Sequence, residues 1–183
     1  APTTIRTNNK KISRDDLMVM IQEHVNVSPC KHSPQGIELE RRAALFSLPA
    51  FKKGFFEMQD EGSQLLSYLV EPKAGDLILD FCSGSGGKSL AFAPLTEGKG
   101  QIFLHDIRER ALVEAKVRFK RAGVQNVQFL HSSSPSLKKL KKKCEWVFVD
   151  APCSGTGTLR RNPDMKYRFD QKMLEELQGK QRN

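Results

Sequence analysis

The sequence predicts an α/β protein in which a doubly wound parallel sheet follows a small α+β lobe. From residue 77 onward, short apolar segments alternate with helical segments, the arrangement that βαβ units produce. The apolar segments are typical of strands buried on both faces of a sheet. Pro49 and Gly54 interrupt the chain shortly before this region. We therefore expect a lobe over residues 1–56 and a main domain over residues 57–183.

The lobe begins with an expected strand over Thr3–Thr7. Ser13 is then a candidate helix N-cap, and the acidic residues at positions 15 and 16 favour the first turn of that helix. Ser28–Gly36 is rich in proline, serine and glycine, so we expect a loop there. Ile37 and Leu39 alternate with glutamates, which indicates a second short strand.

The main domain is expected to begin with a short helix and to continue as alternating strands and helices. The expected strands are Leu77–Phe81, Gln101–Asp106, Val127–Leu130 and Trp146–Asp150, and the expected helices are Gly62–Val70, Lys88–Leu95, Glu109–Ala122 and Asp170–Gln178. No further strand follows within the 183 residues. The sheet is therefore expected to be truncated at its C-terminal side.

Composition narrows the classes of function. The chain has 30 Lys and Arg against 21 Asp and Glu, a net charge of +9, which favours a polyanionic partner and nucleic acid first. No apolar run approaches the ~18 residues of a spanning helix. The first residues given, Ala1–Arg6, have no apolar stretch of the kind expected in a secretory signal. Four cysteines, at positions 30, 82, 144 and 153, form no C-x-x-C pair. We expect no disulfide framework, no metal site and a reducing, cytoplasmic setting.

A glycine-rich turn joins the first strand of the main domain to its helix. Its residues are Cys82, Ser83, Gly84, Ser85, Gly86, Gly87 and Lys88. Glycines let a backbone approach a ligand closely, and the following helix N-terminus adds N–H donors. Two interpretations of this turn are near matches to phosphate-binding motifs. A dinucleotide fingerprint would need glycine at position 89, where serine stands, and a P-loop would need glycine at position 82, where cysteine stands.

A third interpretation is the nucleoside-binding turn of a methyltransferase, with Asp106 at the end of the second strand binding ribose hydroxyls. A tight turn without a ligand is the fourth. The sequence pattern alone leaves these alternatives open.

An aspartate and a cysteine follow the fourth expected strand, in the segment Asp150-Ala151-Pro152-Cys153. A cysteine thiolate can add to carbon 6 of a pyrimidine and so make carbon 5 nucleophilic, and a carboxylate can hydrogen-bond the base. Ligands of open α/β sheets lie at the carboxyl ends of strands, so we expect both side chains near the glycine turn. The alternative for Cys153 is a buried apolar residue, which we accept for the other three cysteines.

Five blocks of the sequence together resemble one known family. They are Phe46–Phe51, Gln59–Gln64, Leu79–Cys82 with Gly86–Lys88, Asp150–Gly157 and Arg160–Asp164. With them the chain resembles the Sun (nucleolar-protein/Sun) family of S-adenosylmethionine-dependent RNA cytosine-5 methyltransferases, and most of all its bacterial 16S ribosomal RNA branch. The resemblance implies a Rossmann-like class I methyltransferase core and an N-terminal RNA-binding lobe.

The resemblance also implies roles for single residues. The glycine-rich turn would line the S-adenosylmethionine pocket, Asp106 would bind the ribose, and Asp150 would lie between the methyl donor and the target cytosine. Cys153 is similar to a cysteine that helps to release the methylated product. The attacking cysteine of the family lies in a later Thr-Cys-Ser segment, and no cysteine follows Cys153 here. We therefore expect these 183 residues alone to be inactive.

The partner implied by the resemblance is RNA, ribosomal RNA first and transfer RNA second, and we expect a monomer. Three alternatives are kept: a non-catalytic module that binds RNA or S-adenosylmethionine, a P-loop phosphotransferase built on Gly87-Lys88-Ser89, and a DNA cytosine-5 enzyme that attacks with Cys153.

The chain departs from the family pattern at three places. Gly84-Ser85 replaces Ala-Pro in the turn. Ser133 stands where an aspartate that contacts the adenine is usual, so we include Ser133 among the cofactor-binding residues. An arginine usual in the helix after Asp106 is displaced by one position, to Arg110.

Basic residues give several candidate phosphate contacts. Arg6, Lys10 and Lys11 lie in the lobe, which resembles the RNA-binding appendage of the family. The group nearest to Cys153 in the sequence is Arg160, Arg161, Lys166 and Arg168, and further candidates are Lys138–Lys143 and the helix over Arg108–Arg121. For most of that helix a solvated charged face is the simpler interpretation.

Overall fold

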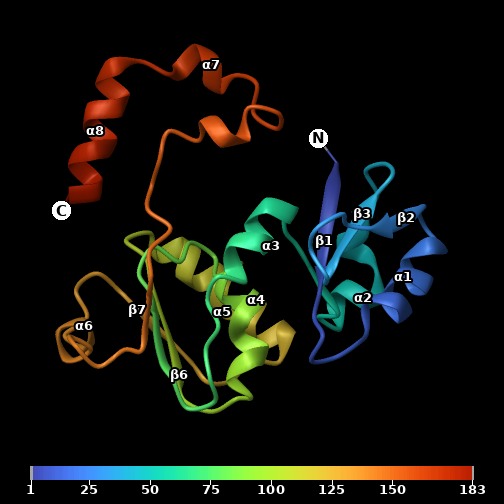
Figure 1. Ribbon diagram of the computed structural model, residues 1–183, viewed down its shortest axis with the longest axis horizontal. Coiled ribbons are helices and arrows are strands. Elements are labelled where there is room, and N and C mark those ends of the chain that lie inside the picture. The colour runs from blue at the N-terminus through green and yellow to red at the C-terminus, as the bar shows by residue number, and fades with distance from the viewer. Residues whose placement is uncertain (1, 183) are drawn as a thin grey trace. The chain divides into compact units, whose positions relative to one another are not determined.

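A computed structural model describes residues 2–182 and divides them into two units, residues 2–149 and residues 150–182 (Figure 1). The strands are β1 Thr3–Thr7, β2 Val27–Pro29, β3 Gly36–Leu39, β4 Phe56–Met58, β5 Leu77–Asp80, β6 Gln101–His105, β7 Val127–Leu130 and β8 Trp146–Phe148. The α-helices are α1 Arg14–Gln22, α2 Pro49–Lys52, α3 Glu61–Ser67, α4 Ser89–Phe92, α5 Glu109–Ala122, α6 Ser136–Lys139, α7 Met165–Arg168 and α8 Gln171–Arg182. Three 3₁₀ helices are Leu45–Ser47, Ala93–Thr96 and Thr156–Thr158.

The N-terminal lobe, residues 2–58, is an antiparallel sheet covered by α1 and α2. Its strand order is β2-β3-β1-β4, and every neighbouring pair is antiparallel. Ile5 and Ile37 from the sheet, Leu17 from α1 and Phe56 from β4 are fully buried in one apolar cluster. Ser13 caps α1 as predicted, because its hydroxyl accepts a hydrogen bond from the Asp16 N–H.

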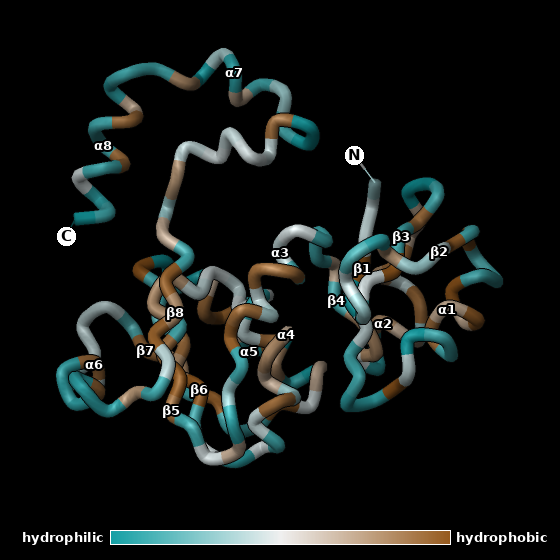
Figure 2. Tube along the Cα trace, viewed as in Figure 1, coloured by the Kyte–Doolittle hydropathy of each residue, from teal (hydrophilic) through white to brown (hydrophobic). Residues whose placement is uncertain are grey.

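The parallel sheet has the strand order β7-β6-β5-β8, and all three of its strand pairs are parallel. Consecutive strands are joined by helices, and β8 lies on the opposite side of β5 from β6. This order confirms the predicted doubly wound α/β class. The strands of this sheet appear mostly brown in Figure 2, and Ile78, Ile102 and Leu104 are buried in the core. The expectation of burial on both faces is wrong for β8, where Val147 is 61% exposed.

Helix α5 packs against this sheet through one apolar face. Leu112, Ala115 and Phe119 recur at helical spacing and are all buried against the strands. The helix ends at Gly123, whose φ of 79° is left-handed, as the sequence predicts. In Figure 1, α3, α4 and α5 lie between the parallel sheet and the lobe.

The predicted block Gln59–Gln64 holds the lobe and α3 together. Gln59 accepts a hydrogen bond of 2.6 Å from the Arg6 Nε, and the buried Gln64 amide donates to the Gln59 carbonyl. Glu61 accepts the backbone N–H groups of residues 32 and 33. The Arg6 side chain is buried in this network, so it is not available to the RNA-binding surface that the resemblance implies for the lobe.

Backbone carbonyls of α5 also hold the lobe in place. The Asn8 side-chain amide donates to the carbonyls of Gly54 and Ala122, and the Lys11 ammonium donates to the carbonyls of Lys53 and Arg121. The predicted domain boundary after residue 56 falls inside β4, which pairs with β1. The division into two domains stays a prediction.

The C-terminal segment, residues 150–182, consists of a 3₁₀ turn and the helices α7 and α8. None of its described side chains is buried. Helix α8 continues through Gly179 to Arg182, beyond the predicted end at residue 178.

Several other predicted bounds differ from the structure. The helix expected over Gly62–Val70 is α3, Glu61–Ser67, and the strands expected over Leu77–Phe81 and Gln101–Asp106 each end one residue earlier. The expected loop Ser28–Gly36 begins inside β2 and ends inside β3, the expected helix Lys88–Leu95 is split into α4 and a 3₁₀ turn, and the strand expected over Trp146–Asp150 ends at Phe148.

Candidate cofactor site and catalytic segment

The glycine-rich turn after β5 is fixed to the end of β6 by hydrogen bonds. The Ser83 N–H donates to the His105 carbonyl at 2.9 Å, and the Gly84 N–H donates to the Asp106 carboxylate at 2.8 Å. Within the turn, the Gly86 N–H donates to the Ser83 carbonyl. The structure therefore brings the predicted turn and the predicted acidic residue together at the carboxyl edge of the parallel sheet.

The conformation of this turn depends on glycine. Gly84 and Gly86 have φ values of 55° and 74°, which residues with side chains rarely adopt. A Cβ on Gly86 would lie 2.6 Å from a ring carbon of Phe119 and 2.8 Å from Leu104. Gly86 thus serves the close packing of the turn on α5 and β6, as well as any ligand above it.

Asp106 is a buried carboxylate with both oxygens hydrogen-bonded. One oxygen accepts the Gly84 N–H and an Arg108 Nη2–H, and the other accepts the Arg108 N–H and Nε–H. Burial by itself would raise the pKa of Asp106, but the hydrogen bonds from Arg108 and Gly84 outweigh it, so the pKa lies below its ordinary value. The carboxylate is therefore ionised at neutral pH, with its oxygens ordered.

Ile107 and Arg108 directly follow Asp106, and neither was predicted from the sequence to lie at the cofactor site. The Arg108 guanidinium lies on the Asp106 carboxylate and is 69% exposed. Ile107 is 78% exposed, an unusual position for a large apolar side chain that directly follows a buried strand end. The sequence did contain a signal for Ile107: an isoleucine directly follows the aspartate at the end of an apolar strand.

Ser89 argues against the P-loop interpretation. Its side chain is fully buried, and its hydroxyl donates to the Asp80 carboxylate at 2.5 Å. The serine or threonine of a P-loop must instead present its hydroxyl to a magnesium ion. The following helix, α4, has only four residues.

The other predicted cofactor residues lie around the same edge. Cys82, Gly87 and Lys88 are half-buried, and Ser133 is exposed in the loop after β7. Strand β7 pairs with β6, so the loop after it starts at the same edge as Asp106.

Asp150 and Cys153 belong to the C-terminal segment, where both are exposed. The Gln181 side chain of α8 donates to the Pro152 carbonyl, and the hydroxyls of Ser154 and Thr156 share a hydrogen bond. Arg160, Arg161, Lys166 and Arg168 are exposed further along. Tyr167, 80% exposed, lies under the Lys166 ammonium, so this segment presents aromatic as well as cationic groups.

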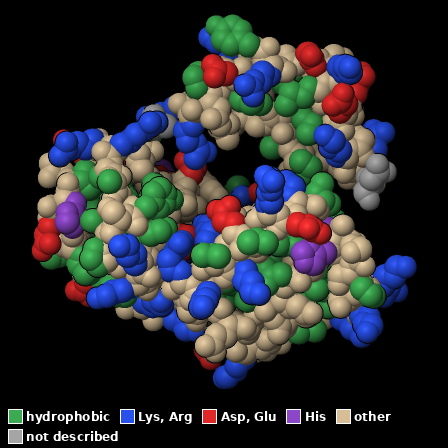
Figure 3. Space-filling view, turned by 180° about the vertical axis from the view of Figure 1, so that it is seen from behind, with side chains coloured by type: hydrophobic (Ala, Val, Ile, Leu, Met, Phe, Trp, Pro, Cys, Tyr) green, Lys and Arg blue, Asp and Glu red, His purple; other side chains and the backbone are tan. Residues whose placement is uncertain are grey.

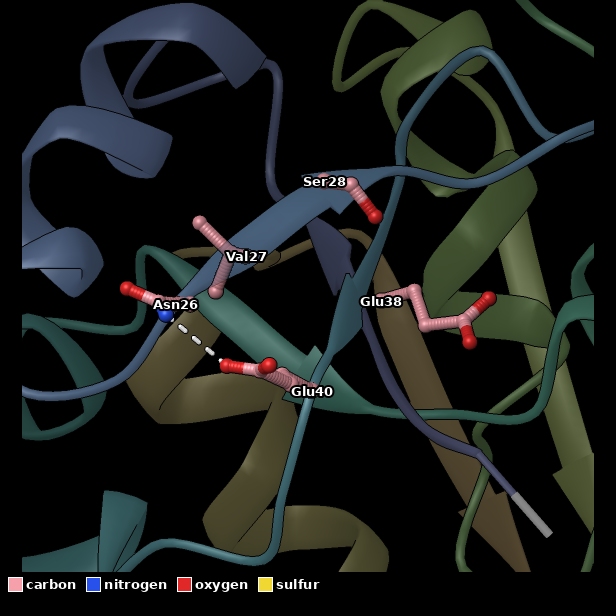
Figure 4. Close-up of a pocket in the computed structure, with 5 residues that line it drawn as sticks. All are labelled: Asn26, Val27, Ser28, Glu38 and Glu40. Atoms are coloured by element: carbon pink, nitrogen blue, oxygen red, sulfur yellow. Dashed lines mark hydrogen bonds between the residues drawn. The ribbon is translucent and has the colours of Figure 1, made fainter.

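A shallow hollow of about 470 Å³ lies beside β2 and β3, away from the glycine-rich turn in sequence. Asn26, Val27, Ser28, Glu38 and Glu40 line it. Figure 4 shows the carboxylates of Glu38 and Glu40 pointing away from one another, with Glu40 accepting a hydrogen bond from Asn26. Its acidic lining does not suit a phosphate.

Within residues 2–182 no group of three or more His, Cys, Asp or Glu side chains is arranged for a metal ion. Across the same described range, no helix combines the length and apolarity that a bilayer crossing requires.

Comparison with known families decides the membership of the chain. Residues 67–183 match the family described as 16S rRNA methyltransferase RsmB/F. The chain belongs to the RsmB/F family. This confirms the family resemblance and the Rossmann-like methyltransferase fold, and with them the prediction of S-adenosylmethionine as cofactor.

Similar proteins agree with this membership. The chain is 32% identical over 171 residues to ribosomal RNA small subunit methyltransferase B of Citrobacter koseri, and 30% identical over 168 residues to a probable methyltransferase B of Synechocystis. These matches cover 91% and 90% of the chain but 39% and 38% of the relatives. A solved methyltransferase homolog from Pyrococcus horikoshii superposes with a TM-score of 0.76 at 31% identity, covering 91% of this chain and 55% of that one.

Proposed function

We propose that this RsmB/F chain supplies the S-adenosylmethionine-binding part of an RNA cytosine-5 methyltransferase that modifies small-subunit ribosomal RNA. The observation that carries the proposal is the Asp106 carboxylate, held by the Gly84 N–H at the carboxyl end of β6. Family membership and the names of the relatives support the ribosomal substrate.

The residues at this edge fit the proposed cofactor. The ionised Asp106 carboxylate can accept hydrogen bonds from the two hydroxyls of a ribose once the exposed Arg108 guanidinium gives up the two acceptor positions that it occupies. The exposed Ile107 side chain beside it offers apolar surface to an adenine ring. Ser133 would contribute a hydroxyl from the neighbouring strand end. S-adenosylmethionine, when bound, supplies a methyl group activated by the positive charge on its sulfur.

Asp150 and Cys153 are proposed to act on the target base. The Asp150 carboxylate can hydrogen-bond the amino group or ring nitrogen of cytosine and stabilise its protonated state. For Cys153 the family resemblance implies a part in releasing the methylated base. The covalent attack on carbon 6 then falls to a second cysteine, and none follows Cys153 in the 183 residues.

The charge of the chain suits an RNA partner. The net charge is +9, and Figure 3 shows Lys and Arg side chains spread over the face in view. In the C-terminal segment, exposed arginines accompany Tyr167, a combination that suits phosphate contacts and base stacking. We expect a monomer that binds RNA through such a surface.

The cofactor assignment is tested by calorimetry with S-adenosylhomocysteine and with ATP. We expect the first to bind and the second not to bind. Asp106→Asn removes the charge that orients the ribose hydroxyls and should weaken S-adenosylhomocysteine binding by about 10- to 100-fold. Asp170→Asn is the control, because that carboxylate only caps α8 through the Met173 N–H. Equal affinity of the two variants would contradict the assignment.

The reaction is tested with ribosomal RNA that carries tritium on carbon 5 of cytosine, since methylation at that carbon releases the label. The protein that contains this chain together with a second cysteine should release tritium. The 183-residue chain alone should release none. Sustained release by the 183 residues would show that the division of labour between two cysteines is wrong here.

A further inference from the structure

Arg118 of α5 connects the lobe to the glycine-rich turn. Its Nε donates to a Glu57 carboxylate oxygen at 3.0 Å, while its Nη1 donates to the Ser85 carbonyl at 3.1 Å and to the Ser85 hydroxyl at 2.6 Å. The Arg118 side chain is 14% exposed and that of Glu57 is 5% exposed. The prediction of a solvated charged face is therefore wrong for this position.

A second arginine shares Glu57 but does not reach the turn. The Arg121 Nη2 donates to the other Glu57 oxygen at 2.6 Å, and its guanidinium lies 4.0 Å above the Phe51 ring. The Arg121 side chain is 17% exposed. The two arginines thus have similar burial and a common partner, and they differ in whether they contact Ser85.

We propose that Arg118 is a positioning residue for the cofactor turn. Because Arg118 contacts both Glu57 of the lobe and Ser85 of the turn, the docking of the lobe on α5 determines the orientation of Ser85 and thereby the affinity for S-adenosylmethionine. This inference rests on the proposed assignment of the turn as the cofactor-binding loop.

The physical basis is that the turn is held from two sides. On one side the Gly84 N–H is bound to Asp106, and on the other the Ser85 carbonyl and hydroxyl are bound to Arg118. A guanidinium has a planar array of donors in fixed directions, so it can orient two acceptors of Ser85 while it pairs with a carboxylate. Glu57 fixes the guanidinium in turn, because it is buried and its charge needs both partners.

Loss of Arg118 would release one side of the turn only. Ser85 would lose both of its contacts with α5, whereas Asp106, Gly86 and the packing on Phe119 would remain. The backbone groups that face the cofactor would then sample more orientations, and binding would have to order them again. That ordering lowers affinity without removing any group that touches the cofactor.

The matched pair Arg118→Gln and Arg121→Gln tests the proposal. Both variants weaken the lobe contact through Glu57, so both should lower the free energy of unfolding in urea. Only Arg118→Gln should speed amide hydrogen exchange at residues 83–88 and weaken S-adenosylhomocysteine binding, by about tenfold in calorimetry. Equal exchange in the turn for the two variants would overturn the proposal and assign Arg118 to lobe docking alone.

Ser85→Ala is the second variant, in case Arg118→Gln does not fold. It leaves the pair between Arg118 and Glu57 intact and removes the bond to the hydroxyl. We expect about threefold weaker S-adenosylhomocysteine binding with unchanged unfolding in urea, and no additional loss when it is combined with Arg118→Gln. If Ser85→Ala alone binds S-adenosylhomocysteine as tightly as the unmodified chain, the proposed linkage is overturned. Independent, multiplying losses in the double variant, where it folds, would overturn it as well.

The two assignments fail in different ways. If the unmodified chain binds no S-adenosylhomocysteine, the cofactor assignment is wrong and the proposal falls with it. If the chain binds and the two arginine variants behave alike, only the positioning role is wrong.

Discussion

The two units of the molecule are stabilised in different ways. Residues 2–149 contain two apolar clusters and the buried polar network around Glu57 and Arg6. Residues 150–182 contain exposed helices, and within this segment the Gln181 side chain donates to the Pro152 carbonyl. The proposed cofactor residues, apart from Asp150, lie in the first unit, and the proposed base-contacting residues lie in the second.

This difference separates two properties of the protein. Cofactor binding should depend on a prebuilt turn whose geometry is fixed by burial. Action on the base should depend on a segment that has little burial of its own to order it. Substitutions at corresponding residue types in the two units should therefore have unequal effects.

The largest contrast is expected between the thiols of Cys30 and Cys153. Burial raises the pKa of Cys30 to about 11, so little thiolate is present near neutral pH, whereas Cys153 is exposed. At pH 7.5 a water-soluble disulfide reagent should modify Cys153 at least about 100-fold faster than Cys30. The measurement is the reaction time course, compared with that of Cys153→Ser. If the fast phase of modification is still present in Cys153→Ser, the expected difference in reactivity between Cys153 and Cys30 is wrong.

A smaller contrast is expected between two glycines. Gly86→Ala places a Cβ against Phe119 at a left-handed φ and should lower the free energy of unfolding by about 2–4 kcal/mol. Gly157→Ala is the matched change in the C-terminal segment, where a Cβ meets nothing within 4 Å, and should alter it by less than about 0.5 kcal/mol. Urea denaturation measures both. Similar decreases in the free energy of unfolding for the two variants would contradict the open surroundings of Gly157.

The smallest effect is expected at Arg108, which occupies acceptor sites of Asp106 that the ribose hydroxyls would use. Arg108→Ala should tighten S-adenosylhomocysteine binding by about two- to fivefold, the range expected for an exposed ion pair that must open. Arg110→Ala, on the exposed side of the same helix turn, should leave the dissociation constant unchanged. Weaker binding by Arg108→Ala would mean that the arginine itself contacts the cofactor.

Local sequence patterns were sufficient for the architecture. Alternation of apolar segments with helices predicted the parallel sheet, and Ser13 and Gly123 predicted the ends of helices, because capping depends on neighbouring residues only. The glycine-rich turn and Asp106 were predicted to meet, since parallel strands end at one edge.

Contacts between distant residues could not be predicted in this way. Arg6, Arg118 and Arg121 are ordinary basic residues in the sequence, and only the packing of β1, β4 and α5 buries them. The departure from the family pattern at Ser85 was visible, but the contact of its hydroxyl with a side chain 33 residues away was not. Charge counts give no sign of which cations are solvated.

The Asn8 side chain has a consequence for the order in which the chain is assembled. Its amide bridges the carbonyls of Gly54 and Ala122, which lie 46 and 114 positions further along. During synthesis, the first residues of the lobe leave the ribosome long before the last turn of α5 exists. The strands of the lobe can pair with one another by then. The contact of the lobe with α5 is complete only when Ala122 has been synthesised. The lobe, which is synthesised before α5, thus reaches its final environment only after the last turn of α5 has been made.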